Sequence, residues 1–278
     1  MRLDGRRESS NFDDRRGRRG GRKLAAGSIG TVIIAAILTW IMGGDPLAVI
    51  SGQGGSLLGG STEQTGSYTP TAEEEELARF SRQILAGTED VWTDIFRQMG
   101  REYEPPTLVL FSGSVQSGCG GATSATGPFY CSADQCLYID LSFFSDMRRN
   151  LGADGDFAYA YVIGHEVGHH VQYLLGIHMV THPELKAKFC YLPTVPTLID
   201  GMITGISVRT ELQADFLAGV WAHHDNARFG SLEEGDIEEA LDAAQKIGDD
   251  YLQKKAQGYA VPESFNHGTS AQRTRWLK

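Results

Sequence analysis

The sequence predicts an α+β protein, mainly helical with a small antiparallel sheet, and three observations support this prediction. An apolar residue recurs every three or four positions over most of the chain after Gly155, and also before Pro105. Two short runs between these regions, Thr107–Phe111 and Leu137–Phe144, have the composition of strands. Few strands among many helices, in a chain of 278 residues, are typical of α+β domains.

Charge divides the chain into a basic leader and an acidic body. Residues 1–23 carry nine Lys/Arg and four Asp/Glu, a net charge of +5. The remaining 255 residues carry 16 Lys/Arg and 31 Asp/Glu, a net charge of −15. The overall charge of −10 argues against a nucleic-acid partner. We therefore interpret the leader as a solvated cytoplasmic tail that fixes membrane topology.

An uncharged segment follows the leader. Residues 24–42 would form a helix of about 28 Å, close to the ~30 Å thickness of a bilayer's hydrocarbon core. Arg22 and Lys23 precede it, and positive flanks stay in the cytoplasm. The segment predicts a single transmembrane anchor, with the N-terminus cytoplasmic and the following domain periplasmic or extracellular. A cleaved signal peptide and a buried core helix are the alternatives.

The folded domain is expected over residues 71–278. Residues 43–70 are rich in Gly, Ser and Thr and predict a flexible linker, because such a composition cannot bury a core. A capping box at Thr71 and Glu74 opens an amphipathic helix or helix pair, which is expected to break near Gly87. Further helices are predicted over residues 157–175, 196–223 and 233–256.

All four cysteines fall in the predicted exported domain, where disulfides persist. Four cysteines allow three sets of two bridges. A Cys119–Cys131 bridge is expected first, because it would close the Gly/Ser/Thr-rich loop between the two strands. Cys136–Cys190 then follows by elimination, and free buried cysteines are the alternative.

The most informative segment is YAYVIGHEVGHHVQYLL, residues 159–175. His165 and His169 are four residues apart, so on a helix both imidazoles lie on one face and can bind one metal ion. Glu166 is offset by about 100° and can address a water on the metal rather than the metal itself. Neutral imidazole is a good zinc ligand. The motif therefore predicts one zinc ion, held by His165 and His169, with Glu166 as the general base.

The residues around the motif distinguish it from a chance match. No charged residue other than Glu166 occurs over residues 157–171, which predicts a buried helix. Gly164 and Gly168 lower helix propensity and indicate a place where another backbone packs closely. His170 points away from the ligand face, so we interpret it as a packed or supporting residue.

A third protein ligand is expected on a second helix. Glu211 and Asp215, four residues apart in RTELQADFLAGVW, share one face of a predicted apolar helix. Two carboxylates there are costly unless a metal or a partner compensates them. We expect Glu211 to bind the zinc and Asp215 to accept the spare N–H of a ligand histidine. His178 and His182 are the alternative ligands.

Two further features bear on catalysis. His267 lies in a loop before a short basic helix and is a candidate to stabilise an oxyanion, a role for which Tyr259 is the alternative. The strand expected at 137–144 is a candidate to pair with an extended peptide substrate, since backbone pairing holds a peptide without reading its sequence.

Taken together, these motifs resemble the bacterial neutral zinc metallopeptidase family over nearly the whole chain. The resemblance is carried by the leader MRLDGRRESSNFDDRRG and the membrane segment, and by four further blocks: GCGGATSATGPFYCSADQCLYIDLSFF, YVIGHEVGHHVQ, RTELQADFLAGVWA and FNHGTSAQR. It implies a zinc ion on His165, His169 and Glu211, with Glu166 as the base. Cys119 and Cys131 match the family block, whereas Cys136 and Cys190 look like an addition. The two metal helices and the tail are also similar to membrane-associated gluzincins.

The sequence and the resemblance lead to one expected function. The chain is expected to be a membrane-anchored zinc endopeptidase with a zincin-like domain, acting on a protein or peptide substrate and not on nucleic acid. Two alternatives stay open: a zinc hydrolase that acts on cell-wall amide bonds, and a non-catalytic zinc-binding scaffold. An open coordination position distinguishes the enzymes from the scaffold, because structural zinc sites are closed by four protein ligands.

Overall fold

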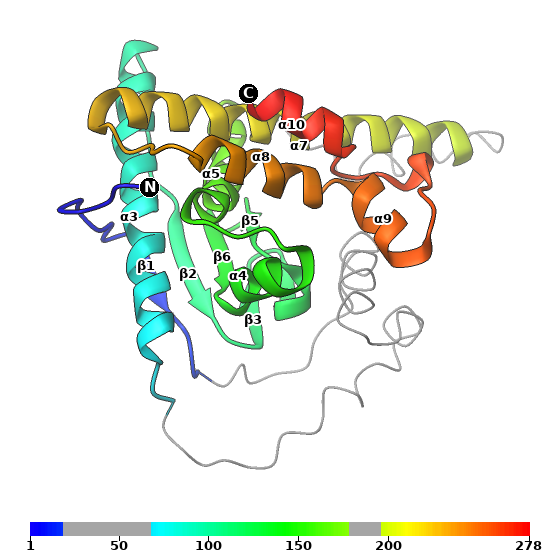
Figure 1. The fold of residues 1–278 in the computed structure, drawn as a ribbon. Helices are drawn as coiled ribbons and strands as arrows, with labels where there is room; N and C mark the ends of the chain where they lie inside the picture. The colour runs from blue at the N-terminus through cyan, green and yellow to red at the C-terminus, as the bar shows by residue number, and fades with distance from the viewer. Residues whose placement is uncertain (19–67, 178–195) are drawn as a thin grey trace.

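Helices make up most of the folded protein, and they surround a small sheet (Figure 1). The computed structural model describes residues 1–18, 68–177 and 196–278, with side chains from residue 207 onward in the last range. The helices are α3 (Ala72–Gln98), α4 (Ser142–Asp146), α5 (Asp156–Leu174), α7 (Pro196–Phe229), α8 (Asp236–Lys246), α9 (Asp249–Gln257) and α10 (Ser270–Leu277). The strands are β1 (Phe12–Asp14), β2 (Thr107–Phe111), β3 (Ser114–Ser117), β4 (Gly120–Thr123), β5 (Phe129–Cys131) and β6 (Cys136–Asp140). The predicted α+β class, mainly helical, is confirmed.

The main sheet has the strand order β1-β2-β6-β5, and β3 and β4 form a separate antiparallel hairpin. β5 and β6 are antiparallel, but the pairs β1–β2 and β2–β6 are parallel, so the prediction of an antiparallel sheet is wrong for these two pairs. The long connection between β2 and β6 is what permits parallel pairing, because a parallel pair needs a crossover of a dozen residues or more.

The predicted strand at 137–144 is shorter than expected and lies inside the sheet. β6 ends at Asp140, and the chain continues directly into α4. Because β6 pairs with β2 on one side and β5 on the other, it has no free edge for a peptide. The interpretation of 137–144 as the substrate-pairing strand is therefore wrong. In the described part of the chain β5 pairs with β6 alone, so it is the edge strand at this end of the sheet.

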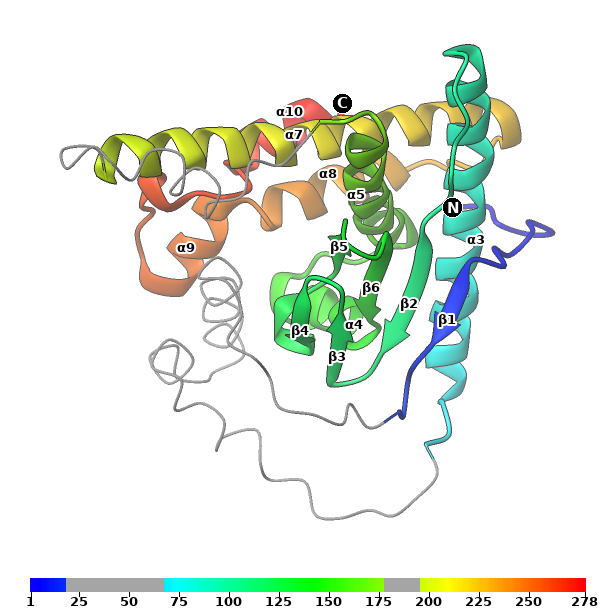
Figure 2. The same ribbon diagram turned by 180° about the vertical axis from the view of Figure 1, so that it is seen from behind.

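Helix α5 is the centre of the hydrophobic core. Fifteen of its 19 residues are buried, which confirms the prediction of a buried helix. It lies in the middle of the molecule, packs against α7, α8 and α3, and touches the edge strand β5 (Figures 1 and 2). The capping box predicted at Thr71 and Glu74 is present and begins α3.

One predicted helix break is absent and one that was not predicted is present, each at a glycine. Gly87 does not break α3, which runs unbroken past it. A Cβ at Gly87 would lie 2.8 Å from an oxygen of Asp225 and 2.9 Å from the Arg6 guanidinium, so this glycine makes room for an ion pair. The helix predicted over 233–256 is instead split into α8 and α9 near Gly248, whose Cβ would lie 2.4 Å from the backbone nitrogen of Ser270.

The start of the chain is part of the folded unit. Residues 12–14 form β1, which pairs in parallel with β2 at one edge of the sheet (Figure 2). The interpretation of the leader as a solvated tail is therefore wrong for residues 1–18. Composition alone does not show this, because Arg6 and Arg16 reach acidic partners, Asp225 and Glu75, more than 50 residues away in sequence.

Several predictions fall on residues that the structure does not describe. The transmembrane anchor at 24–42 lies outside the described residues, as does the linker at 43–70 except for its last three residues. Among the helices in the described part of the chain, none is long and apolar enough to span a bilayer. The Cys119–Cys131 disulfide is present, which confirms the first expected pairing. Cys190 lies in the undescribed range, so Cys136–Cys190 stays a prediction.

The close approach of α5 and α7 generates a stability prediction. A Cβ at Gly168 would lie 2.9 Å from the carbonyl oxygen and 3.1 Å from the Cα of Ala214, both backbone atoms that cannot rotate away. Replacing an exposed helical glycine by alanine stabilises a helix by about 1 kcal/mol. Gly168→Ala should instead destabilise the protein by about 1–3 kcal/mol, because the helices must separate. Urea unfolding measures the sign, and a stabilised variant would contradict this packing.

Candidate metal centre

The candidate centre lies where α5 and α7 cross. α5 supplies His165 and His169, and α7 supplies Glu211, so the structure brings together the three predicted ligands. One ligand atom from each lies within 4.8 Å of the other two. The Nε2 atoms of His165 and His169 are 3.1 Å and 3.5 Å from Oε2 of Glu211. In the part of the chain that the structure describes, this is the one cluster of this kind.

The three residues fit a zinc ion in chemistry, and the carboxylate fits one in its distance to each imidazole. Two imidazoles and a carboxylate are a ligand set of catalytic zinc sites, and bonds of about 2.0–2.1 Å in a tetrahedron put two ligand atoms about 3.3 Å apart. The two separations of 3.1 Å and 3.5 Å lie on either side of that value. The three side chains are only 8–13% exposed, so the centre is shielded from bulk water.

Each ligand histidine has its second ring nitrogen occupied. Nδ1 of His165 lies 2.8 Å from Oδ1 of Asp215, which is the position that the sequence predicted for this carboxylate. Nδ1 of His169 lies 2.9 Å from the side-chain oxygen of Gln172 on the same helix. Gln172 in turn donates to the backbone oxygen of Thr210, beside Glu211. Such partners fix the ring orientation and leave Nε2 for a metal.

The field in the centre favours a cation. Burial lowers the pKa of His165, but the charge and hydrogen bond of Asp215 outweigh it and raise the pKa to about 10. Burial raises the pKa of Glu211, but the charges of His169 and His267 outweigh it, so this pKa stays well below its usual value. Both directions follow from ionised carboxylates beside imidazoles in a site that excludes water.

Behind His165 lies a buried network that the sequence did not predict. Arg273, on α10, donates from Nε to Oδ2 of Asp215 at 3.0 Å and from one terminal nitrogen to Oδ1 at 2.9 Å. Tyr161 donates its hydroxyl to Oδ1 of Asp215 at 2.6 Å and accepts a hydrogen bond from Arg273. Asp215 is fully buried and Arg273 is 3% exposed. A buried aspartate needs a cation to compensate its charge. Asp215, four residues after the candidate ligand Glu211, was therefore the sequence feature that could have indicated a basic partner such as Arg273.

Glu166 is buried on α5 directly after His165, with 8% of its surface exposed. It does not belong to the cluster of three ligands, so its carboxylate is left for another role. Burial lowers the pKa of His169, but the charge and hydrogen bond of Glu211, with a smaller contribution from the charge of Glu166, outweigh it and raise the pKa. The centre thus has three candidate ligands and one further buried carboxylate on the same helix as two of them.

His267 lies in the loop before α10, and Asp249 at the start of α9 fixes it. One carboxylate oxygen of Asp249 accepts from the backbone nitrogens of Asn266, His267 and Gly268. The other lies 3.2 Å from Nδ1 of His267. The loop rests on α7 one turn before Glu211, since Ser207 donates to the backbone oxygen of Asn266.

Burial lowers the pKa of His267, but Glu211 and Asp249 outweigh it and raise the pKa. The alternative residue, Tyr259, is 62% exposed. The other histidines in the described part of the chain do not belong to the cluster. His170 packs against aromatic rings and contacts the Tyr130 hydroxyl, as expected of a packed residue, and burial lowers its pKa to about 4. The alternative ligands His178 and His182 lie outside the described residues.

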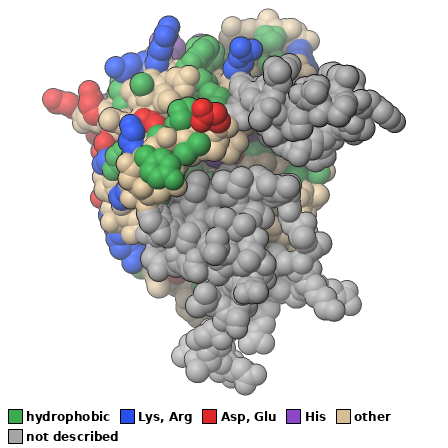
Figure 3. All heavy atoms as spheres, turned by 90° about the vertical axis from the view of Figure 1, so that its right-hand side faces the viewer, with side chains coloured by type: hydrophobic (Ala, Val, Ile, Leu, Met, Phe, Trp, Pro, Cys, Tyr) green, Lys and Arg blue, Asp and Glu red, His purple; other side chains and the backbone are tan. Residues whose placement is uncertain are grey.

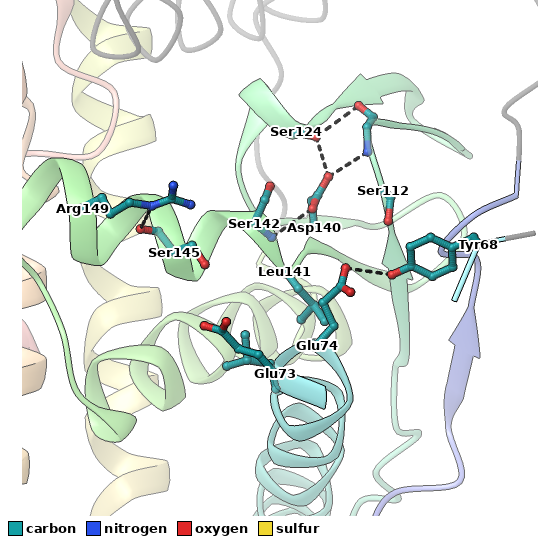
Figure 4. A pocket seen from close by; sticks show the side chains of 12 residues that line it. Tyr68, Glu73, Glu74, Ser112, Ser124, Asp140, Leu141, Ser142, Ser145 and Arg149 are labelled. Carbon is teal, nitrogen blue, oxygen red and sulfur yellow. Dashed lines mark hydrogen bonds between the residues drawn. The ribbon is translucent and has the colours of Figure 1, made fainter. Parts of the chain in front are cut away.

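A surface pocket lies away from this centre, between the start of α3 and the end of β6 (Figure 4). Asp140 is at its base and accepts hydrogen bonds from Ser124 and from the backbone nitrogen of Gly113. None of the candidate metal ligands lines it. On the described part of the face in Figure 3, positive and negative side chains are interspersed.

The buried Arg273–Asp215 pair generates a second prediction. Arg273→Met should destabilise the protein by about 3–5 kcal/mol, because it leaves a buried carboxylate without its cation. It should also weaken zinc binding about 10–100-fold, because His165 loses its fixed orientation. Thermal unfolding and competition with a chelator measure the two effects. Arg275→Met, on the exposed side of α10, is the matched control and should change stability by less than about 0.5 kcal/mol.

Comparison with known proteins agrees with the site. A family model described as "Putative neutral zinc metallopeptidase" matches residues 1–278. The chain is 47% identical to the uncharacterized protein YpfJ of Escherichia coli K12, covering 100% of this chain and 94% of that one. It is 40% identical to the uncharacterized protein Rv2575 of Mycobacterium tuberculosis H37Rv, covering 63% of this chain and 58% of that one. No solved structure matches. The chain therefore belongs to the neutral zinc metallopeptidase family.

Proposed function

We propose that this protein is a zinc-dependent endopeptidase in which Glu166 is the general base. The observation that carries the proposal is the cluster of His165, His169 and Glu211, with the buried carboxylate of Glu166 beside it as a group outside the cluster. A purely structural zinc site is closed by four protein ligands and has no use for a buried general base. A three-ligand site with such a base is the arrangement of zinc hydrolases.

In this proposal, different residues serve different steps of peptide hydrolysis. A bound zinc ion would act as a Lewis acid that polarises the scissile carbonyl and lowers the pKa of water. Glu166 accepts the proton of the attacking water and later delivers it to the leaving amine. In its imidazolium form His267, whose Nδ1 lies 3.2 Å from Oδ1 of Asp249, would donate from Nε2 to the negative charge on the carbonyl oxygen. Burial of the ligand side chains strengthens each of these interactions.

The edge strand supports a peptide as the substrate. β5 is next to α5, and Tyr130 on β5 lies 2.9 Å from the ring of His170, which directly follows the ligand His169. An extended peptide that pairs with the outer edge of β5 would lie along the metal helix. Backbone pairing accepts many sequences, so we propose a peptide or protein substrate without strong side-chain selection. We further propose that residues 24–42 attach the protein to a membrane.

The first test distinguishes the role of general base from the role of zinc ligand. Glu166→Gln should keep about one zinc per chain and lower kcat/KM on casein or a peptide library by about 10²–10⁴-fold. Glu211→Gln should lose both activity and zinc, since it removes a ligand. Metal content by mass spectrometry and peptide turnover are the measurements, and Glu238→Gln, exposed on α8, is the control. Full activity in the Glu166 variant would refute the assignment, and release of peptidoglycan fragments alone would favour a cell-wall amidase.

A second test concerns the Asp249–His267 pair. His267→Ala should lower kcat by about 10²–10³-fold without changing zinc content, because the transition state loses a hydrogen-bond donor. Asp249→Asn should lower kcat less and shift its pH dependence, because it removes the charge that supports the imidazolium. The double variant should be no slower than His267→Ala, since Asp249 acts through the ring. Strictly additive losses in kcat would show that the two residues act separately.

A further inference from the structure

The first 18 residues contribute a strand to the sheet of the metal-binding domain. β1 pairs in parallel with β2 over the residues Phe12, Asp13 and Asp14. Backbone hydrogen bonds continue beyond it on both sides, from Leu108 to Asn11 at 2.9 Å and from Arg15 to Leu110 at 2.8 Å. β2 is itself a buried strand next to β6. The leader thus covers an edge of the sheet that would otherwise be open.

Two buried carboxylates of the domain have partners in the leader, and the cation beside Asp225 comes from it. Arg6 lies 2.7 Å from Asp225 on α7, where the carboxyl side chain is 2% exposed. Ser9 and Asn11 both donate to Glu89, which is 6% exposed in the middle of α3. Gly87 leaves the space in which Arg6 reaches Asp225. A buried charge needs such partners, so the domain is built to hold this segment.

The end of the leader and the start of the following described segment lie side by side. A Cβ on Gly17 would lie 2.3 Å from the Cβ of Tyr68, although 50 residues separate the two in sequence. On the leaving side, Arg16 donates to the Glu75 carboxylate at 2.8 Å. On the returning side, Tyr68 donates to Glu74 at 2.8 Å (Figure 4). Both ends of the intervening segment are therefore fixed to the first turn of α3.

We propose that residues 1–18 are an integral part of the metal-binding domain, so that the N-terminal leader and the metal centre lie on the same side of any membrane the chain meets. Hydrogen bonds cannot form across a hydrocarbon core of about 30 Å, so a single crossing between residues 18 and 68 is incompatible with this fold. Any contact of the intervening segment with a membrane must therefore leave residues 18 and 68 on one side of it. This replaces the topology expected from the charge pattern, in which leader and domain lie on opposite sides, and it does not depend on the proposed enzymatic function.

The test joins the leader to the domain in intact cells. Arg7 lies 2.7 Å from Asp90 at the surface of α3, so both side chains can be exchanged without opening the core. In the full-length chain, Arg7→Cys with Asp90→Cys is treated with a short membrane-permeant bismaleimide, and cross-linked peptides are identified by mass spectrometry. The control pair is Arg7→Cys with Lys254→Cys, an exposed position on α9 at the other side of the molecule (Figure 1).

Each result decides the proposal. We expect the Arg7–Asp90 pair to yield at least about ten times as much cross-linked peptide as the control pair. The reason is that docking of the leader raises the effective concentration of the two thiols. In spheroplasts, a membrane-impermeant maleimide should label the two single variants alike, either both or neither. Absence of the cross-link, or labelling of one single variant only, would overturn the proposal. Neither readout uses zinc or peptide turnover, so loss of the peptidase assignment would leave the result unaffected.

Discussion

The metal centre depends on one buried carboxylate, that of Asp215. It is fully buried, and its two oxygens accept hydrogen bonds from His165 and Tyr161 on α5 and from Arg273 on α10. Three helices that are distant in sequence are thus tied together at the back of one ligand histidine. A buried carboxylate is unfavourable without a cation, so the negative charge that orients His165 also requires α10 to close over the site. The orientation of His165 and the packing of α10 against α5 and α7 therefore depend on the same side chain, Asp215.

That constraint can operate only because α5 and α7 approach so closely. Gly168 lies one residue before the ligand His169, and it faces the backbone of Ala214, one residue before Asp215. Gly164 performs the same function against the ring of Trp221. Larger side chains at these two positions would push α7 away and carry Glu211 and Asp215 with it. The glycines lower the helix propensity of α5, but they allow α7 to approach closely enough for Glu211 and Asp215 to contact the histidines of α5.

The sequence predicts the parts of the centre that local periodicity fixes. His165 and His169, or Glu211 and Asp215, are four residues apart on one helix, so spacing places each pair on one face. Arg273 could not be predicted as a partner, because it meets Asp215 only when α10 folds back across α7. The parallel strands were missed for the same reason. β1 reaches β2 across more than 90 residues, a pairing that depends on side chains far outside any sequence window.

The leader shows how a charge pattern can mislead when partners are far apart. Arginines ahead of an apolar segment favour a cytoplasmic tail, yet Arg6 and Arg16 here pair with carboxylates of α7 and α3. The rule that positive flanks stay in the cytoplasm assumes that those charges are solvated. Once they are paired within a folded domain, their position is decided by the domain. Part of the acidic excess of the body therefore compensates arginines of the leader within the fold.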